Sequence, residues 1–353
     1  METNLLKQLV MASGTSGDEQ EVREILYREL IGQADEITFD GLGSFIARKG
    51  SKGPKVAIIA HMDEVGFIVK HISEDGFLSF DTVGSWWNQS MLNHRVEIRT
   101  RSGKVAGIIG SIAPHALSEK DKAHPMEHDA MFIDIGANST EMVAEMGVAI
   151  GDFVCPEPNF TELTSERILG KALDNRAGCA LVAELFKQCD NDEITLYAVA
   201  TVQEEVGLRG AQTSAEAIQP DIAIVIDTMV TGDTPGFDQI KFPLKLGSGA
   251  ALALFDKRYI PHQKLKQHLV ELAQNIAEPL QFCTMKTGAT DGGRYNVMGG
   301  GRPVVAFCLP TRYLHANSSM ISKADYDSLA KLIERFLKGY STEKHAEICR
   351  YIG

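Results

Sequence analysis

The chain has 353 residues, of which 44% are hydrophobic and 23% charged, and its formal net charge is −12. This composition is ordinary for a globular protein, and the length is comfortable for two domains. The acidic charge and the absence of any long basic run argue against nucleic acid and membrane surfaces as partners.

The N-terminal stretch METNLLKQLVMASGTSG lacks the basic start and long apolar core of a signal peptide. No uninterrupted apolar run is long enough to span a bilayer, so a cytoplasmic protein is predicted. The six cysteines form no CxxC pair, and several lie in apolar segments, which predicts buried, reduced thiols.

The first segments of the chain predict the start of an α/β domain. Apolar side chains recur at helical spacing in residues 18–30, which predicts an amphipathic helix. A short strand is expected within FDGLGSFIAR (39–48), and the apolar run KVAIIA (55–60) predicts a central strand. Three ionisable residues, His61, Asp63 and Glu64, follow that central strand directly.

Between residues 66 and 160 the pattern changes. Short alternating segments such as RVEIRT, KVAGIIG and MFIDIG lie between Gly, Ser, Asn and Pro clusters, as in β-hairpins or a small barrel. The polar stretch 113–130 is expected to be a mobile loop.

After about residue 165, strands and helices alternate again. The pattern predicts a helix over 175–188, strands over 193–202, 221–227 and 303–309, and a helix between Pro261 and Pro279. Ser322 and Asp325 resemble a capping box for a last helix that Gly339 ends. The predicted organisation is an α/β domain made of residues 1–65 and 161–353, interrupted by a β-rich insertion over 66–160.

Polar residues end the apolar strands or open the helices of this predicted domain. Open α/β sheets bind ligands outside the carboxyl ends of their strands, so these side chains are expected at one edge. Burying several carboxylates together is costly unless cations neutralise them, and the set suits Zn²⁺ or another divalent ion such as Co²⁺ or Mn²⁺. The set comprises His61, Asp63, Asp174, Glu204, Glu205, Asp227 and His315.

Their spacing suggests different chemical roles for these residues. His61 and Asp63 lie on the same side of an extended segment, so one can bind metal while the other accepts the remaining ring N–H. Glu204 and Glu205 point in different directions, so one can bind metal while the other acts as a general base. Each residue alone also has a structural explanation, such as a helix cap for Asp174 or Asp227.

Ordered motifs give the chain a family resemblance. It resembles the co-catalytic metallopeptidases of the glutamyl aminopeptidase and tetrahedral aminopeptidase family, including deblocking-type aminopeptidases. The matching stretches run in order through most of the chain: FDGLGS, AHMDEVGF, IDIGA, GVAIGDFV, GKALDNRAG, VQEEVGLRGA, VIDT, GATDGG and RYLHANSS.

The resemblance implies a doubly wound, zinc-peptidase-like catalytic domain with an inserted β-barrel that serves dimerisation. It implies a two-metal aminopeptidase that removes the N-terminal residue of short peptides. Family members commonly form dodecameric tetrahedral shells, so self-association is expected.

The resemblance also implies roles for the individual residues. Asp174 would bridge two divalent ions, zinc being the first choice, and Glu204 would activate a metal-bridging water while Asp63 orients His61. The remaining ligands would be His61 and Asp227 for one ion, and Glu205 and His315 for the other.

The sequence does not show which first substrate residue such an aminopeptidase would prefer. Thr290, Asp291 and Arg312 are expected near the pocket for the first substrate side chain. An Arg or Lys that points into this pocket would favour acidic N-termini, and an apolar pocket would favour Leu or Met. Glu64 receives no metal and is expected beside the site or at the hinge to the insertion.

Two other functions are considered. Related co-catalytic deacylases and carboxypeptidases use the same ligand types, so a deacylase or amidohydrolase acting on a small N-acyl substrate is the alternative. In that group the insertion comes late, whereas here the wide gap lies between His61 and Asp174, which favours the aminopeptidase. A non-catalytic assembly protein is disfavoured by the intact set of ligands and Glu204.

Overall fold

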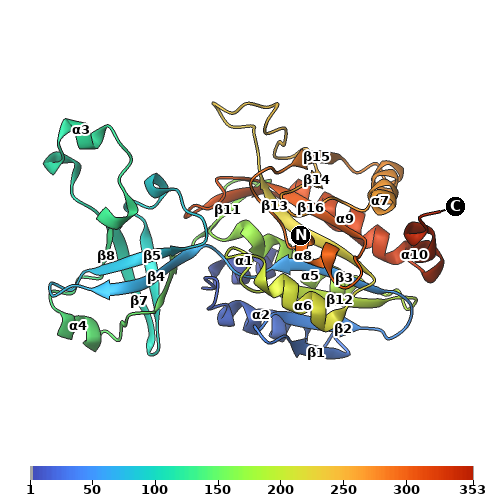
Figure 1. Ribbon diagram of the computed structural model, residues 1–353, viewed down its shortest axis with the longest axis horizontal. Coiled ribbons are helices and arrows are strands. Elements are labelled where there is room, and N and C mark those ends of the chain that lie inside the picture. The colour runs from blue at the N-terminus through green and yellow to red at the C-terminus, as the bar shows by residue number, and fades with distance from the viewer. Residues whose placement is uncertain (1–2, 353) are drawn as a thin grey trace.

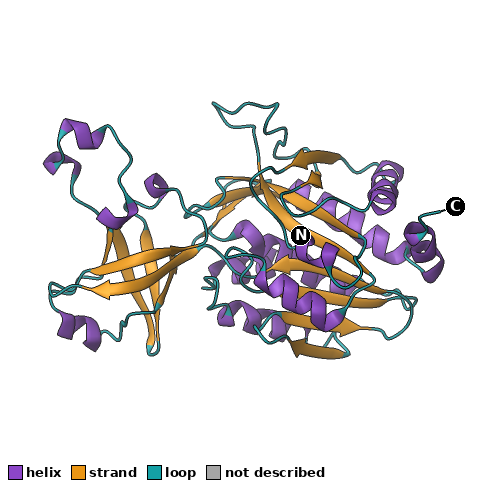
Figure 2. Ribbon diagram, in the orientation of Figure 1, coloured by secondary structure: helices purple, strands orange, loops and turns teal. Residues whose placement is uncertain are grey.

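A computed structural model describes residues 3–352, apart from the side chains of residues 114, 120 and 121. The chain forms an α/β domain and a separate six-stranded closed barrel that stands to one side of it (Figure 1). Figure 2 shows helices on both faces of the large sheet, whereas the barrel consists mainly of strands. The predicted fold class, an α/β domain with an inserted small barrel, is confirmed.

The helices and strands have the following bounds. The α-helices are α1 Thr3–Met11, α2 Gln20–Leu30, α3 Glu119–Lys122, α4 Thr140–Glu145, α5 Leu173–Gln188, α6 Arg209–Ile218, α7 Gln263–Asn275, α8 Gly292–Val297, α9 Lys323–Gly339 and α10 Thr342–Cys349. The strands of the large sheet are β1 Glu36–Phe39, β2 Phe45–Lys49, β3 Lys55–His61, β10 Phe160–Glu162, β11 Arg167–Gly170, β12 Thr195–Thr201, β13 Ile222–Val230, β14 Ala250–Phe255, β15 Leu280–Thr284, β16 Val304–Arg312 and β17 Ser319–Ser322. The barrel strands are β4 Gly66–Ile72, β5 Leu78–Val83, β6 Arg95–Thr100, β7 Gly103–Gly110, β8 Phe132–Asp134 and β9 Phe153–Pro156.

The centre of the large sheet is parallel. Its main path runs β1-β2-β12-β3-β13-β16-β17-β11-β10, and β14 and β15 extend from β16. Strands β12, β3, β13 and β16 run in the same direction, with Thr201 opposite His61 and Asp227 opposite Cys308. The carboxyl ends of these four strands therefore meet at one edge of the sheet.

Two hydrophobic cores cover the two faces of the sheet. In β3, Val56 and Ile58 face the core formed with α1, α2, α5, α7 and α9, while Ala57 and Ile59 face the core formed with α6 and α8. Alternate residues of a strand point to opposite faces, so a strand that is buried on both sides reads as one apolar run. The run KVAIIA has this pattern because β3 lies between two helical layers.

The barrel has a core of its own, built from alternate residues of its strands, with Phe67 packed edge-on against Phe80. Ion pairs join the barrel to the start of α2, for example Arg99 with Asp18 at 3.0 Å. The barrel strands span Gly66 to Pro156. The predicted insertion, 66–160, ends at Phe160, which begins β10 of the large sheet, and these domain limits stay a prediction.

One local prediction was wrong. Helix α9 begins after Ser322, but no capping hydrogen bond forms there. The Ser322 hydroxyl instead accepts a 2.8 Å hydrogen bond from Arg167, and the Asp325 carboxylate accepts from the backbone N–H groups of Gly247 and Gly249 at 2.8 and 2.7 Å. Partners from distant parts of the chain thus replace the local capping pattern. The polar stretch 113–130 contains the short helices Pro114–Ala116, Glu119–Lys122 and His128–Ala130.

Candidate active site

The parallel strands bring the predicted polar residues to one edge of the sheet. His61 is the last residue of β3, and Asp227 lies in the last half of β13. Glu204 and Glu205 follow β12, His315 follows β16, and Asp174 lies in the first turn of α5. Residues far apart in the sequence meet here because the strands share one direction.

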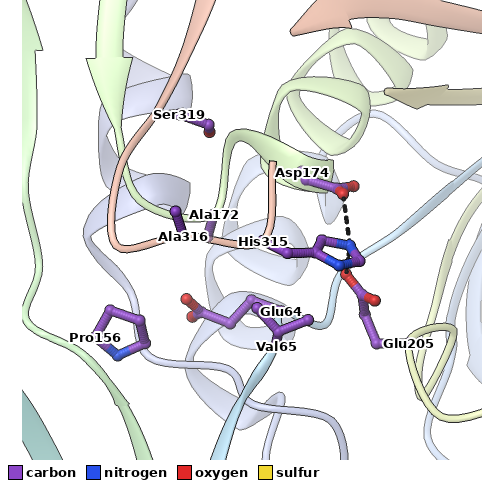
Figure 3. A pocket seen from close by; sticks show the side chains of 9 residues that line it. All are labelled: Glu64, Val65, Pro156, Ala172, Asp174, Glu205, His315, Ala316 and Ser319. Atoms are coloured by element: carbon purple, nitrogen blue, oxygen red, sulfur yellow. Dashed lines mark ion pairs between the residues drawn. The ribbon is translucent and has the colours of Figure 1, made fainter. Parts of the chain in front are cut away.

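Asp174 lies at the centre of the group. Its Oδ1 is 3.1 Å from His61 Nε2, and its Oδ2 is 3.5 Å from His315 Nε2. His61 Nε2 is also 3.7 Å from Asp227 Oδ1, and His315 Nε2 is 3.3 Å from Glu205 Oε1. Figure 3 shows the His315 ring pointing at both Asp174 and Glu205. One carboxylate therefore connects two histidine-containing groups.

Each of these groups has the chemistry of a metal site. Within each group, one ligand atom per residue lies within 4.8 Å of the others. One imidazole and two carboxylates form a donor set that Zn²⁺, Co²⁺ or Mn²⁺ accepts. Two of the three such groups share Asp174, namely His61–Asp174–Asp227 and Asp174–Glu205–His315, and the third is His61–Glu204–Glu205. The described residues could therefore hold divalent metal ions.

The protonation equilibria reflect an excess of negative charge in the site. Burial raises the pKa of Glu204 well above its usual range, and the neighbouring carboxylates add to this rise. Burial alone would lower the pKa of His315, but hydrogen bonds to Asp174 and Glu205 raise it to about 11. Because the carboxylates favour positive charge so strongly, bound cations would be stabilised here.

Asp63 holds several parts of the site together. The buried carboxylate lies 3.4 Å from His61 Nδ1, and it accepts hydrogen bonds from the N–H groups of Glu204 and Glu205 at 3.0 and 3.1 Å. The Ser16 hydroxyl donates a further hydrogen bond of 2.6 Å to it. Asp63 thus positions an imidazole and the turn that carries both glutamates. Ser16 was not predicted from the sequence, because it lies in a polar stretch without a distinctive motif.

Glu64 lies in a buried ion-pair cluster. Its Oε1 accepts hydrogen bonds from Lys171 Nζ at 2.6 Å and from an Arg176 guanidinium nitrogen at 2.9 Å. Both cations lie on the segment that carries Asp174, and they also donate to backbone carbonyls between Leu9 and Gly14. The cluster therefore connects the ends of β3 and α1 with the loop of the central aspartate.

Two cavities meet at the site. A small one of about 20 Å³ lies between Glu64, Asp174, Glu205 and His315 (Figure 3). A large cleft of about 1020 Å³ contains the site on one side. Its other side consists of residues 240–244 in the loop after β13, the turn after β14 and the segment 283–289.

The three residues predicted near the substrate pocket are absent from the lining of this cleft. Thr290 is buried and donates a 2.9 Å hydrogen bond to Asp256, and Asp291 accepts one of 2.5 Å from Thr201. Arg312 forms a two-pronged ion pair with Asp233 at 3.0 and 2.6 Å. Their contact with substrate stays a prediction without support from their placement.

The fold and this group of candidate ligands are what a metal-dependent peptide hydrolase requires. A family model described as M42 glutamyl aminopeptidase matches residues 43–332. The chain belongs to the M42 family of aminopeptidases, whose members are metallopeptidases that use divalent ions.

Similar proteins share this length and fold. FrvX of Escherichia coli (strain K12), whose name marks it as a candidate aminopeptidase, is 65% identical over 98% of this chain and 97% of its own. A TET aminopeptidase structure from the marine sediment archaeon Thaumarchaeota archaeon SCGC AB-539-E09 has a TM-score of 0.95 and 38% identity, covering 98% of both chains.

Two relatives at lower identity are aminopeptidases that are named for different amino acids. The glutamyl aminopeptidase of Lactococcus lactis subsp. cremoris (strain MG1363) is 33% identical over 98% of both chains. The lysyl aminopeptidase of Pyrococcus furiosus is 32% identical over 95% of this chain and 96% of its own. The Pyrococcus horikoshii TET1 peptidase, which can assemble into a tetrahedron or an octahedral shell, has a TM-score of 0.86 and 29% identity, covering 96% of this chain and 99% of its own.

Proposed function

We propose that this aminopeptidase works with two divalent metal ions that share Asp174, and that Glu204 is its general base. The observation that supports the proposal is the shared carboxylate: Asp174 belongs to two of the three groups that could hold a metal ion, and it is the residue common to those two. Zinc is the first choice because imidazole and carboxylate donors suit it, with Co²⁺ and Mn²⁺ as alternatives. The proposed ligands are His61 and Asp227 on one side, and Glu205 and His315 on the other.

When bound, the metal pair would supply Lewis-acid polarisation of the scissile carbonyl. The rest of the chemistry falls to the residues of the chain. Glu204 lines the same cleft as the proposed ligands, so its carboxylate is placed to hold a proton between two steps. We propose that it takes this proton from the attacking water and returns it to the leaving amine.

Asp63 is proposed as a positioning residue. Its carboxylate lies beside His61 Nδ1 and holds the N–H groups of Glu204 and Glu205. An ionised carboxylate at this place fixes the tautomer and direction of the imidazole and the backbone of the base. Burial alone would raise the pKa of Asp63, but its contacts with His61 and Ser16 lower it, which keeps the group ionised.

We propose short peptides with a free N-terminus as substrates, and self-association through the barrel. The dodecamer and the tetrahedral shell named for the Pyrococcus horikoshii relative support a tetrahedral dodecamer that is built from dimers. No described helix is both long and apolar enough to cross a membrane. The cytoplasmic location stays a prediction from the sequence.

The test compares free-amine substrates with blocked ones on the metal-reconstituted protein. Leucyl-, glutamyl- and lysyl-p-nitroanilide are assayed beside N-acetyl amino acids, the substrates of the alternative deacylase. We expect hydrolysis of the free-amine anilides and none of the N-acetyl compounds. Turnover of the N-acetyl compounds alone would contradict the aminopeptidase and support the deacylase.

A further inference from the structure

A short segment between α1 and α2 lies beside the proposed active site. This N-terminal segment comprises residues 13–19, which lie outside the part of the chain that the family model matches. The Ser16 N–H donates to the Glu64 carbonyl at 3.3 Å, and the Glu64 N–H donates to the Gly14 carbonyl at 2.9 Å. The N-terminal segment is therefore fixed beside the stretch that follows β3, in which Asp63 lies.

The turn formed by Gln203, Glu204 and Glu205 depends on side chains for three of its backbone hydrogen bonds. The Gln203 N–H donates to Glu19 Oε1 at 3.2 Å. The next two N–H groups donate to the two oxygens of Asp63, at 3.0 and 3.1 Å. Gln203 has a φ of 55°, a conformation that is unfavourable for a residue with a Cβ atom. Two buried carboxylates thus hold the backbone on both sides of the proposed base.

Ser16 and Glu19 connect the N-terminal segment to this turn. The Ser16 hydroxyl donates to Asp63 Oδ2 at 2.6 Å, and the same oxygen accepts from the Glu205 N–H. Glu19 Oε1 accepts a second hydrogen bond, of 2.7 Å, from the Gly17 N–H, so its side chain is held against its own segment. Ser16 is 4% exposed and Glu19 is 3% exposed. Buried hydrogen bonds are stronger than those in water, so these contacts restrain the turn.

These contacts bear on the orientation of Glu204 and not on the substrate. Among the described residues that line the cleft, neither Ser16 nor Glu19 is present. The carboxylate of Asp63 can rotate about its last side-chain bond, and the Ser16 hydroxyl favours the rotation in which both oxygens face the turn. A catalytic group must be held to within about 0.5 Å of its productive position. Loss of either contact should therefore slow the chemical step and leave substrate binding unchanged.

We propose that Ser16 and Glu19 are positioning residues for Glu204. This inference rests on the proposed function, because the role of Glu204 as general base belongs to it. Ser16 acts through the carboxylate of Asp63, and Glu19 acts through the N–H of Gln203. The N-terminal segment thus contributes to catalysis from outside the substrate cleft.

Four single variants of the metal-reconstituted protein test the two residues. Ser16→Ala and Glu19→Ala remove the contacts, whereas Ser16→Thr keeps a hydroxyl donor and Glu19→Gln keeps an oxygen acceptor. Each is assayed with the free-amine anilide that the wild type hydrolyses fastest. In the alanine variants we expect kcat to fall about 10-fold or more, with KM within about twofold of the wild type and unchanged metal content. The threonine and glutamine variants should restore most of the lost kcat.

Ser13→Ala is the matched control. Ser13 is a buried serine of the same segment, but its hydroxyl donates to Glu97 of the barrel at 2.7 Å and not to Asp63. The kcat of this control should stay within about twofold of the wild type, because the lost contact lies outside the site. Urea denaturation of all variants measures the lost stability. A fall in kcat caused only by a weaker fold would therefore appear in the control as well.

The double variant Ser16→Ala/Glu204→Gln shows whether Ser16 acts through the base. Its residual kcat is measured with the rate of the metal-free protein subtracted. Without the base, positioning has nothing to act on, so this kcat should equal that of Glu204→Gln alone. Glu19→Ala/Glu204→Gln gives the same comparison for Glu19.

The outcomes separate this inference from the proposed function. An equal fall in kcat in both backgrounds, or an alanine variant with full kcat, would overturn the positioning role of that residue and leave the proposed function intact. A Glu204→Gln protein with full kcat, or a wild type that hydrolyses no free-amine substrate, would refute the proposed function and the inference with it.

Discussion

Replacing Glu64 by glutamine would leave two buried cations without the carboxylate that neutralises them. The side chains of Lys171 and Arg176 are 0% exposed, and that of Glu64 is 3% exposed. Removing one member of a buried ion pair costs about 3–5 kcal/mol, because the remaining charge stays buried. Lys171 and Arg176 keep their backbone carbonyl acceptors, so we expect a loss near the lower limit, about 3 kcal/mol in the free energy of unfolding.

Urea denaturation measures this loss. Both tryptophans, Trp86 and Trp87, lie in the barrel portion of the chain, so their fluorescence reports on the barrel while far-UV circular dichroism reports mainly on the helices of the α/β domain. Glu157→Gln is the control, because Glu157 pairs with Arg95 on the surface at 2.6 Å with both side chains exposed. Its effect should stay below about 1 kcal/mol. Equal, small losses for Glu64→Gln and the control would show that the buried ion pairs of Glu64 do not stabilise the fold.

Two further predictions concern protonation and the thiols. Burial would raise the pKa of Asp233, but its ion pair with Arg312 lowers the value from 3.8 to about 2. A carboxyl group with a lowered pKa stabilises the folded state at pH values above its pKa in the unfolded chain. The wild type should therefore exceed Asp233→Asn in the free energy of unfolding by the full amount above pH 3.8, and this difference should shrink as the pH falls towards 2. A difference that does not depend on pH would contradict this prediction. Five of the six free cysteines are buried and only Cys349 is partly exposed, so a thiol reagent should modify about one thiol per native chain, and six after unfolding; rapid native modification of several thiols would contradict the assigned burial.

The sequence predicted the site best where one strand had both a clear apolar pattern and ionisable residues at its end. The run that forms β3 is apolar because both faces of the strand are buried, and it stops at His61 because the strand ends at the site. Placing Glu205 and His315 beside it followed from the rule that parallel strands end at one edge, whereas Asp174 was expected there as a residue that opens a helix. The site residues came together in space as that rule predicts.

Contacts between distant segments could not be predicted in this way. Glu64 is 107 residues from Lys171 and 112 from Arg176, and nothing local in the sequence pairs them. The same holds for Arg312, expected near the substrate pocket but paired with Asp233, 79 residues away. The sequence could not show which basic residues line the cleft, because the lining depends on how the ends of β14 and β15 are held together.

Glu204 is proposed to act as the base beside two ions held by the other residues of the site. The most direct measurement is the kcat of metal-reconstituted Glu204→Gln together with its metal content by mass spectrometry, with His315→Ala as a comparison that should lose metal. Glu204→Gln is expected to bind two ions per chain and to lose at least about 100-fold in kcat. Activity that persists with both ions bound would contradict the role of Glu204, and a chain that never binds two ions would contradict the two-metal site.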